Sequence, residues 1–217
     1  MNSSDSSPSS QALFTVGHSN HELPVFLELL QAHDIKAIAD VRSHPYSRQN
    51  PQFNRESIQG ALDARGIEYG FFGIQLGARR TEPEAYVDGK AEYGLIAESE
   101  AFQYGLEKLR ESVETYRIAL MCAEKDPLTC HRCILIGRHL RDEFDIYHID
   151  SDGEIETHTQ AEDRLLELLK MPTQDLFQSR EDLVEQAYDI QGDKIAYVRT
   201  ESVENPEDGL PGREGGL

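Results

Sequence analysis

Residues able to do chemistry concentrate in one short stretch of the chain, MCAEKDPLTCHR at 121–132. It contains two thiols, two carboxylates, an imidazole and a guanidinium, contributed by Cys122, Cys130, Glu124, Asp126, His131 and Arg132. An apolar run over 118–121 is typical of a buried strand, a proline then interrupts it, and helical spacing resumes after the second cysteine. This order predicts a strand, a loop and a helix. Such a loop lies at the carboxyl edge of a sheet, where open α/β folds bind ligands.

Cys130 is a candidate catalytic nucleophile. We expect it near a helix N-terminus beside His131 and Arg132, where positive charge stabilises a thiolate. The alternative is a small buried thiol that only packs. Cys122, Cys130 and His131 would also suit a soft metal, with His18 as a fourth ligand, but structural zinc sites usually show tighter paired spacings. We therefore predict no cofactor and no metal ligands, and zinc remains the alternative.

A cysteine-phosphatase loop does not fit the same stretch. Ten positions separate Cys122 from Arg132, and no glycine lies between them to let the backbone wrap a phosphate. The carboxylates of the stretch would instead serve as acid and base, so Glu124 and His131 join Cys130 as candidate catalytic residues.

Two further motifs, TVGHSN at 15–20 and DVRSHPYSR at 40–48, each follow an apolar run. His18 is either a general base or a hydrogen-bonded structural histidine. A guanidinium meets phosphate with two parallel hydrogen bonds, so Arg42, Arg48 and Arg132 are candidate anion ligands. Tyr46 would stack on a base, or simply pack within its loop. The predicted substrate-binding residues are Ser19, Asp40, Arg42, Tyr46, Arg48, Cys122 and Arg132, with Asp40 orienting Arg42.

The elements that would position these residues alternate along the chain. Apolar runs predict strands over 12–16, 35–41, 67–72, 117–122 and 146–149, and helical spacing predicts helices over 22–33, 54–65, 100–116, 130–142 and 161–170. Residues 73–94 are expected to form a long connection rather than core, and 155–158 a hairpin strand after Asp152-Gly153. The prediction is a three-layer α/β fold, with a mostly parallel sheet of about five strands and helices on both faces. Its carboxyl edge would gather the three motifs.

The expected organisation is a leader over 1–11, an α/β domain over 12–170, a segment over 171–199 that docks on it, and a tail over 200–217. The leader and the tail lack apolar periodicity, so we expect disorder there. The docking segment is amphipathic. We expect it to bury Leu176, Phe177, Leu183, Val184 and Ala187.

The charge of the chain limits its partners. The net charge of -19 argues against bulk attraction to nucleic acid or to an anionic membrane. Residues 36–80, however, hold seven basic and four acidic side chains, against seven and 21 over 140–217. This contrast favours a small anionic or nucleotide-like ligand held in a pocket. Nucleic acid would have to bind there rather than through bulk charge, and the oligomeric state stays open.

The cysteine count and the apolar runs bear on where the protein resides. Three cysteines are too few for a disulfide framework, so reduced thiols in a cytoplasm are expected. No run of about 18 apolar residues is present, so no membrane span is expected.

The motifs resemble those of domain-of-unknown-function family 488. The resemblance rests on TVGHSN at 15–20, DVRSHPYSR at 40–48, LG at 76–77 and CAEKDPLTCHR at 122–132, in this order across residues 12–150, and 176–199 resembles longer members. One departure is Ala78, where members often carry a second glycine. The resemblance implies a compact α/β domain with a site on these motifs, and no reaction. Titratable residues converging with arginine favour an enzyme that acts on a phosphate-bearing substrate, a nucleotide or a nucleic-acid end. The alternative is a non-catalytic binding or regulatory module that uses the same pocket.

Overall fold

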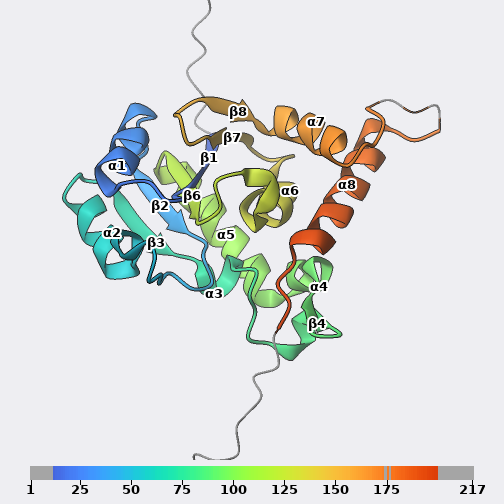
Figure 1. Cartoon of the computed structure of the whole chain (residues 1–217), viewed down its shortest axis with the longest axis horizontal. Coiled ribbons are helices and arrows are strands. Elements are labelled where there is room, and N and C mark those ends of the chain that lie inside the picture. The colour runs from blue at the N-terminus through green and yellow to red at the C-terminus, as the bar shows by residue number, and fades with distance from the viewer. Residues whose placement is uncertain (1–11, 174, 176, 200–217) are drawn as a thin grey trace, which may run out of the picture.

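A six-stranded sheet organises the chain, in the order β3-β2-β6-β1-β7-β8 (Figure 1). The computed structural model describes residues 12–173, 175 and 177–199; the expected leader, the tail and Leu176 lie outside the described residues. The strands are β1 (Ala12–Gly17), β2 (Ala37–Asp40), β3 (Glu68–Phe71), β6 (Ile118–Cys122), β7 (Asp145–Ile149) and β8 (Ile155–Thr157). Five of them run parallel, and β8 pairs with β7 antiparallel. The predicted parallel α/β architecture is confirmed, with the hairpin strand as the sixth.

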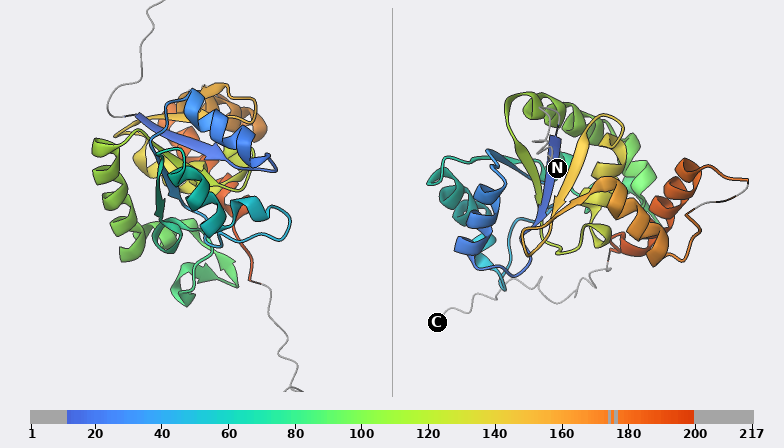
Figure 2. Two further views of the ribbon diagram at one scale, coloured as in Figure 1. Left: turned by 90° about the vertical axis from the view of Figure 1, so that its left-hand side faces the viewer. Right: turned by 90° about the horizontal axis from the view of Figure 1, so that it is seen from above.

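Alternate residues of the central strands face two separate apolar layers. In β6, Leu120 and Cys122 join one core while Ala119 and Met121 join the other, as the two-residue period of a strand requires. Helices α1 (Leu23–Ala32) and α2 (Arg55–Asp63) cover the second face. The first face is covered by α5 (Glu100–Thr115), α7 (His158–Leu168), α8 (Arg180–Ile195) and the helix after β6. Figure 2 shows α7 and α8 on the side of the molecule away from α1 and α2.

The segment over 73–94 differs from the expected plain connection. It forms α3 (Gly73–Leu76), a 3-10 turn (Pro83–Ala85) and a hairpin of β4 (Tyr86–Val87) with β5 (Lys90–Ala91), and it enters α4 (Tyr93–Glu98). Leu76 and Tyr93 are buried in the first core, so the expectation that this segment lies outside the core was wrong. No helix of the described residues is long and apolar enough to cross a membrane.

The helix after β6 is not a regular α-helix. A 3-10 turn at Pro127–Thr129 comes first. Residues Arg132–Gly137 then form a π-helix, which continues directly as α6 (Arg138–Leu140). All six π-helical residues are buried. Such wide turns are rare and are frequently found at functional sites.

The C-terminal helix begins later than the amphipathic pattern suggested. A capping box of Ser179 and Asp182 starts α8 at Arg180. Leu183, Val184 and Ala187 are buried against the first core. Phe177 precedes the helix and is 94% exposed, so its expected burial was wrong.

The strand register brings the predicted motifs to one edge. Gly17 of β1 lies opposite Cys122 of β6, and Asp40 of β2 lies opposite Met121. The backbone N–H of His18 then donates to the Cys122 carbonyl at 2.8 Å. Gly17 is required here, because a Cβ atom at this position would lie 1.9 Å from the Glu124 carbonyl oxygen. The β1 end therefore approaches the loop after β6 as closely as a backbone can.

Candidate active site

A cavity of about 500 Å³ opens at this carboxyl edge. Its volume lies within the usual range of small-molecule sites. Eight of the predicted site residues line it: His18, Ser19, Arg42, Tyr46, Cys122, Glu124, Cys130 and His131. The other three, Asp40, Arg48 and Arg132, do not. Arg48 is exposed outside the cavity, and the other two are buried behind its wall.

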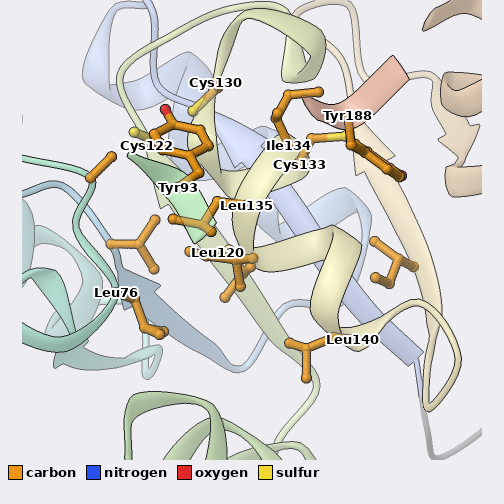
Figure 3. Packing of buried hydrophobic residues seen from close by; sticks show 14 of the residues in the cluster. Leu76, Tyr93, Leu120, Cys122, Cys130, Cys133, Ile134, Leu135, Leu140 and Tyr188 are labelled. Carbon is orange, nitrogen blue, oxygen red and sulfur yellow. The ribbon is translucent and has the colours of Figure 1, made fainter. Parts of the chain in front are cut away.

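Two thiols and a carboxylate meet on one side of the cavity. Both Cys122 Sγ and Cys130 Sγ donate to the same oxygen, Glu124 Oε2, at 2.9 and 3.0 Å. All three side chains lie close to the phenol of Tyr93, and Figure 3 shows both sulfurs beside that ring. We call Cys122, Glu124, Cys130 and His131 the thiol cluster.

The surroundings of the two thiols push their pKa values apart. Burial opposes ionisation of Cys130, but the hydrogen bond from Cys122, the charge of Arg132 and the contact with His131 hold the pKa of Cys130 well below its usual value. The same hydrogen bond, together with burial, raises the pKa of Cys122. Burial and the neighbouring Cys130 also raise the pKa of Glu124. Cys130 is therefore the thiol of the pair that loses its proton first.

Two backbone contacts add to this environment. Cys130 precedes the helical residues, so the N–H of Arg132 points at its sulfur over 3.5 Å. His131 Nε2 lies 3.0 Å from the Val41 carbonyl, which can only accept, so this nitrogen carries the ring proton. The other nitrogen, Nδ1, lies 3.8 Å from both sulfurs of the thiol cluster. Its lone pair is therefore directed at the thiols.

Arg132 is placed differently from the anion ligand that we expected. Its side chain is fully buried, and the guanidinium donates to the carbonyls of Glu124 and Lys125 at 2.7 and 3.0 Å. The fork is thus occupied by the backbone of its own loop. Arg132 holds Glu124 in place beneath the thiols, and it does not face the cavity.

Arg42 reaches the cavity but is already paired. It forms a bidentate ion pair with the buried Asp40, at 2.9 and 2.6 Å, and Tyr69 donates to the same carboxylate. Its remaining Nη1 lies 3.2 Å from His18 Nε2. His18 Nδ1 lies 2.9 Å from the Ser19 carbonyl, so Nδ1 carries the ring proton and Nε2 accepts from Arg42. Burial and Arg42 lower the pKa of His18 to about 4. A neutral His18 with its lone pair engaged acts as a partner of Arg42 rather than as a free base.

The structure adds cavity residues that motif analysis missed. Arg79 lies at the cavity, and its guanidinium stacks on Tyr197 with 4.8 Å between the guanidinium carbon and the ring centroid. Among the described residues it forms no ion pair with a carboxylate. Tyr93 comes from the segment over 73–94, and Tyr197 follows the C-terminal end of α8. Neither segment carries a recognisable motif. The charge contrast over 36–80 included Arg79 and was the one available signal.

A second buried polar group lies on the first face of the sheet. His148 contacts Thr15 Oγ1 at 2.8 Å and His158 at 3.0 Å, and His158 contacts the Tyr188 hydroxyl at 2.8 Å. The Cys133 sulfur lies within 4.8 Å of these rings. Figure 3 shows Cys133 beside Tyr188, apart from the other two cysteines. Sequence spacing gave no sign of this group, because its members come from five different elements.

The fold and the cavity define an α/β protein with a thiol cluster at the carboxyl edge of a parallel sheet. The model of a family described as Domain of unknown function DUF488 matches residues 22–138. The chain belongs to this family. The matched segment contains DVRSHPYSR and the whole thiol cluster, whereas TVGHSN precedes it. No curated protein and no solved structure matches the chain.

Proposed function

We propose that the chain is an enzyme that acts on a phosphate-bearing substrate, a nucleotide or a nucleic-acid end, held in the cavity. One observation carries the proposal. Arg79, a cation without a carboxylate partner among the described residues, shares a single cavity with the thiol cluster. A free guanidinium binds an anion, and a group of titratable side chains beside it supplies the chemistry.

The cavity wall supports a nucleotide over a bare phosphate. Its volume of about 500 Å³ exceeds what one phosphate needs. Tyr46, Tyr93 and Tyr197 line it, and aromatic rings stack on any base. Arg79 then takes over the phosphate-binding role expected of Arg48 and Arg132.

The thiol cluster is the proposed reactive centre. Cys130 lies at its middle, and Glu124 and His131 are placed to move protons. His18 and Asp40 orient Arg42 and are positioning residues in this proposal. Two of the three cysteines lie in the cluster, so a reducing compartment such as the cytoplasm would preserve it.

A panel of nucleotides and phosphate monoesters tests the proposal. The purified chain is incubated with each compound, binding is measured by calorimetry, and products are identified by mass spectrometry. Arg79→Gln should weaken nucleotide binding about 10- to 100-fold, the loss expected for one charge-assisted contact. Arg48→Gln is the matched control, since it removes an exposed arginine outside the cavity and should leave binding unchanged. Cys130→Ser should abolish turnover while binding persists.

Two results would contradict the proposal. Binding that depends on Arg79 without turnover of any compound would favour the non-catalytic module instead. Equal nucleotide binding by the Arg79→Gln and Arg48→Gln variants would show that the cavity is not the nucleotide-binding site.

A further inference from the structure

We propose that Cys122, Cys130 and His131 bind one zinc ion, with the fourth coordination position open to the cavity. Two thiolates and one imidazole form a ligand set that suits zinc, and three protein ligands with one open position are typical of catalytic rather than structural zinc sites. The binding itself stands on the geometry of these side chains. The role of the ion in catalysis rests on the function proposed above.

The distances among the donor atoms fit such an ion. Zinc lies about 2.3 Å from sulfur and about 2.0 Å from nitrogen, so tetrahedral ligands place sulfur and nitrogen about 3.5 Å apart. His131 Nδ1 lies 3.8 Å from Cys122 Sγ and 3.8 Å from Cys130 Sγ. The three donor atoms all lie within 4.8 Å of one another. Each sulfur-to-nitrogen distance therefore exceeds the tetrahedral value by only about 0.3 Å.

The residues behind the ligands are already arranged for coordination. The Val41 carbonyl holds the proton of His131 on Nε2, so Nδ1 presents a lone pair to the sulfurs. The backbone N–H of Arg132 points at Cys130 Sγ, as N–H groups do around bound thiolates. The buried Arg132 side chain adds a positive charge near the two thiolates.

Glu124 can accept the protons that the thiols release when zinc binds. Zinc binding forms two Zn–S bonds and breaks every S–H bond that the two thiols still carry, so up to two protons leave for each ion bound. Both S–H groups already donate to Glu124 Oε2, which lines the cavity and can pass the protons to water. With the ion in place, this carboxylate lies beside the open position and can accept a proton from a water molecule there.

The second group of cysteine and histidine is a weaker candidate. In the group of Cys133, His148 and His158, every ring nitrogen already has a hydrogen-bond partner. A metal would have to break these bonds. Cys133 is therefore a matched control, because it is a buried cysteine three positions from Cys130 and carries the same chemistry.

Titration of the metal-free full chain with Co²⁺, followed by displacement with Zn²⁺, tests the site. We expect one equivalent to bind, with sulfur-to-cobalt charge-transfer bands and the intense visible bands of a tetrahedral ion, and with up to two protons released per ion. Cys122→Ser, Cys130→Ser and His131→Gln should each weaken binding more than about 100-fold, beyond the loss typical of residues that only support a ligand. Cys133→Ser should change it less than about threefold.

Three results would overturn the inference: no binding by the folded chain, a cobalt spectrum without thiolate bands, or unchanged affinity in Cys130→Ser. The wild-type spectrum and proton count do not depend on any variant folding. Nucleotide turnover by a chain that binds no metal would refute the zinc site and leave the proposed enzyme intact. Zinc binding without turnover of any nucleotide would support the zinc site and contradict the proposed enzyme.

Discussion

Replacing Arg132 by lysine should destabilise the protein although the positive charge is retained. The guanidinium donates two hydrogen bonds, at 2.7 and 3.0 Å, to the carbonyls of Glu124 and Lys125. A lysine ammonium lies at the end of an unforked chain and can satisfy only one of them. Each charge-assisted bond contributes about 1.5 to 3 kcal/mol, and the second carbonyl would stay without its partner. We expect the free energy of unfolding to fall by about 2 to 3 kcal/mol.

Urea unfolding followed by far-ultraviolet circular dichroism measures this loss, since the chain has no tryptophan to serve as a probe. A chelator keeps metal binding out of the comparison. Arg132→Met, which removes both bonds, should cost more than Arg132→Lys. Arg48→Lys alters an exposed arginine and should stay within about 0.5 kcal/mol of the wild type. If Arg132→Lys also stays within that margin, the guanidinium does not hold the loop and the placement of Glu124 has another cause.

Two further predictions concern other parts of the fold. Gly17→Ala should lower the free energy of unfolding by about 3 kcal/mol or more in a urea titration, because its Cβ would lie 1.9 Å from a backbone oxygen; Gly60→Ala, with open space around it in α2, should instead raise it by about 0.5 to 1 kcal/mol. Burial lowers the pKa of His158 to about 4, so the unfolded chain takes up the proton first and stability falls as the pH drops. Between pH 7 and pH 5 this amounts to about 2 kcal/mol, and a His158→Gln variant that shows the same pH dependence as the wild type would contradict it.

The sheet could be predicted from the sequence because its signals are local. Apolar runs separated by helical periods imply parallel strands, and parallel strands end at one edge whatever their order. That topology is enough to bring His18, Arg42 and Cys122 to one cavity. The extent of α8 was harder to predict, since Phe177 continues the apolar pattern while the capping box at Ser179 sets the start of the helix.

The direction of individual side chains could not be predicted in the same way. The partners of Arg132 are main-chain carbonyls of its own loop, and whether they face inward depends on the path of that loop. Residue type alone suggested an anion ligand. Arg79 and Tyr197 meet across a long sequence separation without any motif, so only the folded chain shows them together.

The arginines at the carboxyl edge of the sheet differ in role according to their burial. A guanidinium enclosed by protein needs partners within the protein, since leaving its charge unpaired would cost several kcal/mol. The terminal nitrogens of Arg132 donate to loop carbonyls and Arg42 pairs with Asp40, whereas the buried Arg132 Nε has no hydrogen-bond partner among the described residues. The two side chains thereby support Glu124 and His18. An exposed guanidinium does not need protein partners, because water can solvate it. Arg79 is exposed, so water solvates its charge in the absence of a ligand. In the proposed function, the arginine that binds the phosphate is therefore the one that lies outside the conspicuous motifs.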